Sequence, residues 1–98
     1  MRKISEDAYN AFMTKRHFKS GNTEVSIHTE NDSAFMYLFG NLIAKYIVDD
    51  IFISDGNYGY SRTTQDRLNT FPITLRMCKN QWILNEKEIW DGKWRKIN

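Results

Sequence analysis

Two neighbouring apolar runs, residues 35–39 and 42–48, constrain the fold of this chain more than any other feature. Gly40-Asn41 separates them, and such a pair between apolar runs is typical of a two-residue β-hairpin turn. The expected facing pairs are Phe39 with Leu42, Tyr37 with Ala44, and Phe35 with Tyr46. Because both strands are apolar on both faces, the fold must cover each face. We expect a helix on one face and a partner on the other.

The first residues predict that helix. Ser5 is a favoured N-cap, and Glu6 and Asp7 complement the positive end of the helix dipole. An apolar stripe follows, formed by Ala8, Ala11 and Phe12. We therefore predict a helix over residues 6–17, which Gly21-Asn22 brings to an end.

Turn signals divide the rest of the chain into short strands and one short helix. The predicted strands are residues 23–28, 51–53, 73–77 and 81–84, with turns at 31–33, 49–50 and 79–80. A capping-box-like start at Thr63 predicts a helix over residues 63–70. An N-terminal helix, an antiparallel β-meander, a short second helix and C-terminal β-hairpins make an α+β fold. The 98 residues are enough for a single domain over residues 1–98.

Asp91-Gly92 predicts the last hairpin, because Asp-Gly favours the primed turn that matches strand twist. The register of this hairpin pairs Ile89 with Trp94 and Glu88 with Arg95. In that register Trp82 and Trp94 belong to the core. Trp90 is then the tryptophan free to contact a partner.

The cysteine content and the hydropathy pattern favour a reducing, cytoplasmic compartment. A single cysteine, Cys78, excludes an intramolecular disulfide. The sequence shows no signal peptide and no apolar run of the roughly 18 residues that a membrane span needs. We therefore expect no association with a membrane.

Charge is distributed unevenly along the chain. Residues 1–20 and 73–98 carry an excess of basic side chains, and residues 21–60 carry an excess of acidic ones. Such polarity can orient a partner, and it is also compatible with ordinary solvated faces.

Motifs for catalysis or for metal binding are missing from the sequence. His17 and His28 stand apart from any nucleophile or metal ligand. Asp49, Asp50 and Asp55 form the main acidic cluster, and a hairpin turn explains the first two better than a Mg²⁺ site does. We therefore expect a protein that is not an enzyme and that holds no metal and no cofactor.

Two regions have the composition of binding surfaces. The loop at residues 57–62 is rich in the residue types that adaptable binding loops use, and the acidic middle can mimic phosphates. The candidate partner-binding residues are Tyr58, Tyr60, Arg62, Trp90, Asp49, Asp50 and Asp55. The alternative is a basic, aromatic C-terminal sheet that stacks the bases and neutralises the phosphates of single-stranded nucleic acid. Its candidate residues are Trp90, Lys93, Arg95, Lys96, Arg76 and Lys79.

Several stretches resemble small proteins encoded in bacteriophage and prophage genomes. These stretches are residues 4–12, 21–25, 38–44, 63–69, 82–85 and 90–94. The resemblance implies a phage context and supplies no functional residues. By analogy with anti-CRISPR and anti-restriction proteins, we expect a non-enzymatic accessory protein in the host cytoplasm. It would bind and inhibit or modulate a host or defence protein or nucleoprotein, and a homodimer is also compatible with the apolar strands.

Overall fold

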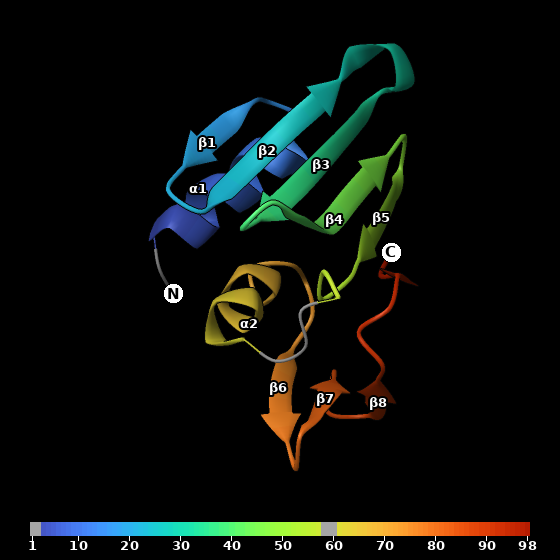
Figure 1. Ribbon diagram of the computed structural model, residues 1–98. Coiled ribbons are helices and arrows are strands. Elements are labelled where there is room, and N and C mark those ends of the chain that lie inside the picture. Colours follow the sequence, from blue (N-terminus) through green and yellow to red (C-terminus); the bar gives the residue numbers. More distant parts are fainter. Residues whose placement is uncertain (1–2, 58–60) are drawn as a thin grey trace.

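A computed structural model describes residues 3–57 and 61–98, which form two antiparallel sheets and two α-helices (Figure 1). The larger sheet has the strand order β1-β2-β3-β4-β5-β9, and the smaller has the order β6-β7-β8. The helices are α1 (Lys3–Met13) and α2 (Arg62–Leu68). The strands are β1 (Phe18–Ser20), β2 (Thr23–His28), β3 (Ser33–Leu38), β4 (Asn41–Ile47), β5 (Asp50–Ile53), β6 (Leu75–Cys78), β7 (Gln81–Leu84), β8 (Glu88–Trp90) and β9 (Arg95–Lys96). The predicted α+β class is confirmed.

Helix α1 lies on one face of the larger sheet, behind β1, β2 and β3 in Figure 1. It ends earlier than predicted because Lys15 takes a left-handed conformation, with φ of 54°. The Arg16 amide then donates to the Ala11 carbonyl at 2.8 Å, and the Lys15 amide donates to the Phe12 carbonyl. This bonding pattern is a Schellman motif, which a glycine more often closes. The predicted end near residue 17 is therefore wrong.

The residues expected to stop the helix have another role. Gly21 and Asn22 form the turn between β1 and β2. Strand β1 was not predicted from the sequence pattern. Gly21 has φ of 54°, which glycine adopts without steric cost. Ser5, expected as the N-cap, lies inside α1 and is buried.

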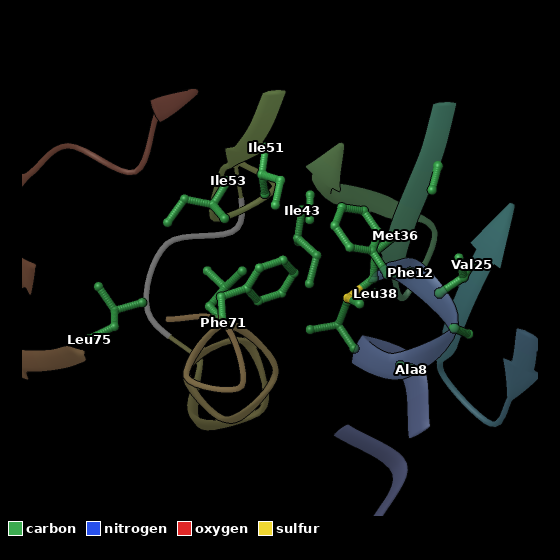
Figure 2. Packing of buried hydrophobic residues seen from close by; sticks show 14 of the residues in the cluster. Ala8, Phe12, Val25, Met36, Leu38, Ile43, Ile51, Ile53, Phe71 and Leu75 are labelled. Atoms are coloured by element: carbon green, nitrogen blue, oxygen red, sulfur yellow. The ribbon is translucent and has the colours of Figure 1, made fainter. Parts of the chain in front are cut away.

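The core fills the space between α1, the larger sheet and the segment after α2. Figure 2 shows side chains from these three parts converging in one cluster. The Phe12 ring of α1 packs against the Phe71 ring at a centroid distance of 5.3 Å and against Tyr46 of β4 at 5.8 Å. Burial of a ring such as that of Phe12 contributes about 1.5–3 kcal/mol to folding. The inner face of the larger sheet and α1 therefore share one apolar core.

The hairpin between β3 and β4 forms, but in a different register from the expected one. Phe39 and Gly40 are the turn residues, with φ of 52° and 79°, and Leu38 pairs with Asn41. The three expected facing pairs are wrong, because the turn is one residue earlier than Gly40-Asn41. Positive φ at both central residues is what a type I′ turn requires.

A β-bulge in this hairpin changes which side chains of β4 face the core. The register shifts between Met36 and Tyr37, so that Tyr37 pairs with Leu42 while Met36 pairs with Ala44. Ile43 is the extra residue, and both it and Ala44 are buried. A bulge places two consecutive residues opposite one and so redirects their side chains.

An arginine joins α2 to α1 and β2 from inside the core. Arg67 is only 1% exposed. Its guanidinium donates to the hydroxyls of Ser5 at 2.7 Å and Thr23 at 2.9 Å, and to the Asn22 amide oxygen at 3.2 Å. The Asp66 carboxylate pairs with it at 3.2 Å and also accepts from Ser5. Complete hydrogen bonding of this kind is what makes a buried charge tolerable.

Helix α2 begins one residue earlier than predicted. Ser61 is its N-cap, and the Ser61 hydroxyl accepts from the Thr64 amide at 3.3 Å. Asn69 follows the helix and bonds Leu75 of β6 in both directions, donating at 2.9 Å and accepting at 2.7 Å. The smaller sheet is thus attached directly to the end of α2.

The predicted hairpin at Asp91-Gly92 does not form. Strand β8 pairs with β7, whereas β9 crosses to the larger sheet and pairs with β5. Gly92, with φ of 81°, is the point where the chain crosses. The expected opposite-charge contact between Glu88 and Arg95 is nevertheless present as an ion pair.

The crossing point is also where the two sheets are joined. The Gly92 carbonyl accepts from the Asp55 amide at 2.9 Å and from the Ser54 hydroxyl at 3.2 Å. The Asp55 carboxylate accepts from the indole N–H of Trp82 at 3.3 Å and from the backbone N–H of Asn57 at 2.9 Å. Asp55 therefore ties the end of β5 to β7 of the smaller sheet.

Candidate binding face of the six-stranded sheet

The larger sheet has a second face, opposite α1, that no helix of the described chain covers (Figure 1). Directly paired residues share a face, so the register places one row of side chains across this outer face. The row consists of Ser26, Phe35, Lys45, Phe52 and Lys96. Their neighbours on the central strands β3 and β5 point inward and are buried, as strand alternation requires. The outer face thus presents aromatic and basic side chains to solvent.

Five residues make up what we call the outer cluster: Phe35, Tyr37, Lys45, Phe52 and Trp94. The Lys45 ammonium lies 4.3 Å from the centroid of the Trp94 ring and 5.4 Å from that of Phe52. These cation–π contacts hold a positive charge against the exposed Trp94 ring and the half-buried Phe52 ring. Aromatic rings and a cation are therefore placed together at the centre of the face.

A hollow of about 580 Å³ adjoins the outer cluster beside Trp94. It is lined by Leu42, Ser54, Gly56, Asn57, Gly92, Lys93 and Trp94. Its lining combines an indole ring, an amide side chain and a lysine. The hollow is an open depression of the surface, not an enclosed cavity.

The cations of this face differ in whether an acidic side chain neutralises them. Lys96 lies 3.5 Å from Asp50, and its neighbour Arg95, which the register places on the other side of β9, pairs with Glu88. Lys45 and Lys93, in contrast, form no ion pair with a residue that the structure describes. Two uncompensated positive charges therefore lie beside the rings.

Trp82 is buried as expected, but Trp90 and Trp94 lie opposite to expectation. Trp82 and Trp90 are both 4% exposed, while Trp94 is 42% exposed. Trp90 pairs with Trp82 across β7 and β8, and its indole N–H donates to the Lys93 carbonyl at 2.9 Å. The prediction of a free Trp90 is wrong, because it assumed that β8 continues into a hairpin. Trp94, expected in the core, follows the crossing point and lies over Lys45.

The candidate partner-binding residues do not form one surface. Asp55 is buried at the junction between the sheets and cannot mimic a phosphate. Asp49 and Asp50 are exposed at the turn between β4 and β5, and Arg62 is exposed at the start of α2. The remaining two candidates, Tyr58 and Tyr60, lie outside the described residues.

The alternative basic set is divided between the two sheets. Arg76 is on β6 and Lys79 is in the turn between β6 and β7, away from the Lys93–Lys96 segment. Arg76 lies 2.5 Å from the Glu86 carboxylate, and this hydrogen bond raises the pKa of the guanidinium above its ordinary value. The C-terminal segment alone therefore supplies only part of a basic surface.

Four members of the outer cluster were not among the candidates from the sequence: Phe35, Tyr37, Lys45 and Phe52. One available signal was Lys45, the only charged residue inside the apolar run of residues 42–48. A cation in such a run points to solvent, because burying it unpaired is costly. Its aromatic neighbours follow only from the bulged register.

Two further observations concern the described residues alone. They contain no group of three or more histidine, cysteine, aspartate or glutamate side chains placed to hold a metal ion. Neither of their helices combines the length and the apolar character needed to cross a membrane.

The family of the chain is shown by comparison with known proteins. Residues 1–96 match the family described as Kyanoviridae Gp96 protein, a family of cyanophages. No match was found among curated proteins or among solved structures. The family match confirms the resemblance to phage proteins, since it extends over nearly the whole chain. The chain therefore belongs to the Kyanoviridae Gp96 protein family and is a small phage-encoded protein.

Proposed function

We propose that this phage protein is a non-enzymatic accessory protein that binds a nucleoprotein of the infected cell, either of the host or of its defence systems. The observation that carries the proposal is the outer cluster on an uncovered sheet face. Exposed aromatic side chains are the commonest anchors of binding surfaces. The face that α1 leaves open is thus the surface best suited to a large partner.

Electrostatics favour a partner that carries negative charge. Lys45 and Lys93 have no acidic partner among the described residues, and both lie at or beside the outer cluster. Paired surface charges contribute little to binding, whereas uncompensated ones steer association with an opposite charge. A nucleoprotein presents both the protein surface and the phosphates that such a face can contact.

A capture experiment tests the proposal. The tagged protein is incubated with host lysate, and retained material is measured as bait concentration rises. We expect saturable capture of a defined complex by the wild-type protein, and loss of capture by the double variant Lys45→Glu with Trp94→Ala. Equal capture by that variant and the wild type would exclude the outer face as the binding site.

Lys79→Glu provides the matched control. It makes the same charge change at an exposed lysine of the smaller sheet. This variant should retain the complex as the wild-type protein does. Loss of capture by both charge variants would point to a general effect of net charge and contradict the proposal.

A further inference from the structure

We infer that the ligand of the outer face is single-stranded nucleic acid, with bases stacked on its exposed and half-buried rings and phosphates neutralised by Lys45 and Lys93. This inference rests on the proposed function and identifies the component of the partner that the face contacts. Its structural basis is the alternation of rings and cations across adjacent strands.

The spacing of the rings suits an extended strand. Phe35 on β3 and Phe52 on β5 flank Lys45 on β4 in one row. Neighbouring strands are about 4.8 Å apart, so these two side chains start about 10 Å from each other. A flexible single strand can place a base on each ring while its backbone passes the lysine between them.

Trp94 offers the most accessible ring of the outer cluster, beside a hollow of mixed polar and apolar lining. The indole is 42% exposed, with Lys45 near its ring and the hollow of about 580 Å³ beside it. The hollow contains the Asn57 amide and Lys93, which can contact the edge of a base and a phosphate. We place one nucleotide there, with its base stacked on Trp94.

Duplex nucleic acid fits this face less well. Its bases are already stacked on one another and cannot use the rings, so only phosphate contacts remain. With two uncompensated lysines, a duplex would bind weakly and without the contribution of stacking. Unpaired bases are therefore part of the chemistry that this face recognises.

Fluorescence anisotropy with purified full-length protein tests the inference directly. The probes are labelled oligothymidylate and oligouridylate of about 10 nucleotides, and a duplex of the same length. We expect both single strands to bind more tightly than the duplex at low salt. The logarithm of the binding constant should fall against the logarithm of salt with a slope of about −1.4 for two phosphate contacts. Absence of binding at low salt, or equal binding of the duplex, would overturn the inference.

Variants at Trp94 separate stacking from a structural role. Trp94→Ala should weaken binding of oligothymidylate about tenfold or more, whereas Trp94→Phe keeps a ring and should retain affinity within a few-fold. Ile89→Ala is the control, because Ile89 is 63% exposed on the smaller sheet. Equal weakening by Ile89→Ala would overturn the assignment. Circular dichroism and thermal melting of each variant show whether it remains folded.

Tryptophan fluorescence supplies an independent measurement. Trp82 and Trp90 are buried, so quenching by a stacked base is expected to come from Trp94. Quenching should therefore disappear in Trp94→Phe although the oligonucleotide still binds. Quenching that persists in this variant would contradict stacking on Trp94.

The same set of experiments distinguishes failure of the inference from failure of the proposed function. Capture that depends on the outer cluster but survives nuclease treatment, with no oligonucleotide binding, overturns the inference and leaves a protein-binding face. Sedimentation that shows a dimer dissociated by Trp94→Ala also overturns it, because a second copy then occupies the face. If the wild-type protein shows neither saturable capture nor oligonucleotide binding, the proposed function is rejected as well.

Discussion

The two faces of the six-stranded sheet are built from the same strands and perform different tasks. On the inner face Met36, Ala44 and Ile53 are fully buried beneath α1 and the segment after α2. On the outer face their immediate neighbours Lys45 and Phe52 remain partly exposed. Strand alternation thus separates stability from surface chemistry at adjacent positions. Substitutions on the two faces should therefore have separable effects, and four predictions test this difference.

The largest effect is expected on the inner face. Phe12→Ala removes a fully buried ring that packs against Phe71 and Tyr46. The free energy of unfolding should fall by about 3–5 kcal/mol in urea denaturation, because the substitution loses burial and leaves a cavity. Phe35→Ala, which truncates an outer ring, should cost about 1 kcal/mol. A similar loss for both variants would show that the two faces contribute equally to the stability of the protein.

The buried polar network on the inner side should rank second. Arg67→Met leaves Ser5, Thr23 and the Asp66 carboxylate without their shared donor. We expect a loss of about 3 kcal/mol, because the cost of unsatisfied buried groups exceeds the gain in apolar volume. The control is Arg62→Met, an exposed arginine at the start of the same helix, which should change stability by less than about 0.5 kcal/mol. Neutral behaviour of Arg67→Met would mean that apolar packing alone holds α2.

The junction between the sheets should rank third. A Cβ at Gly92 would lie 2.1 Å from the nearer Asp55 carboxylate oxygen, at φ of 81°. Gly92→Ala should therefore cost about 2–3 kcal/mol. Gly40→Ala is the matched control, because Gly40 has φ of 79° with no atom within 4 Å of its added Cβ. Its cost should be about 1 kcal/mol, from backbone strain alone.

A double-mutant cycle measures the crowding at Gly92 directly. Asp55→Ala removes the carboxylate that the new methyl group would meet. Gly92→Ala should then cost less than in the wild-type background. Additive losses would show that Asp55 is not the group that excludes a side chain at Gly92.

The smallest effect on stability is expected at the centre of the outer face. Lys45→Gln removes a cation held over Trp94 and Phe52 but no buried contact. The free energy of unfolding, measured by urea denaturation, should change by less than about 0.5 kcal/mol. Binding of oligothymidylate should nevertheless weaken, and its salt slope should become shallower by about 0.7. An unchanged salt slope would show that Lys45 does not contact a phosphate.

Local patterns in the sequence were sufficient for much of the fold. Alternation in residues 23–28 correctly predicted β2, and the turn at Lys79-Asn80 correctly joined β6 to β7. A second helix was also correctly expected after the loop, within two residues at each end. These features are set by side-chain periodicity and by turn residues that tolerate positive φ, both of which are local properties.

The candidate site could not be predicted in the same way, because it depends on pairing between distant strands. Trp90 and Trp94 are only four residues apart, yet the crossing at Gly92 places one in the core and the other on the outer face. Asp91-Gly92 has the composition of a hairpin turn. Only the contact with Asp55 shows that Gly92 is instead the point where the chain crosses between the two sheets.

The sequence by itself determined the α+β class, the position of most strands and the membership of a phage protein family. The tertiary structure decided which side chains share the outer face, because one bulge and one crossing strand set the register of β4 and β9. A shift of one residue in strand pairing moves side chains to the opposite face. Hydrophobic burial against α1 selects one strand register over those shifted by a residue. That burial exists only in the folded chain.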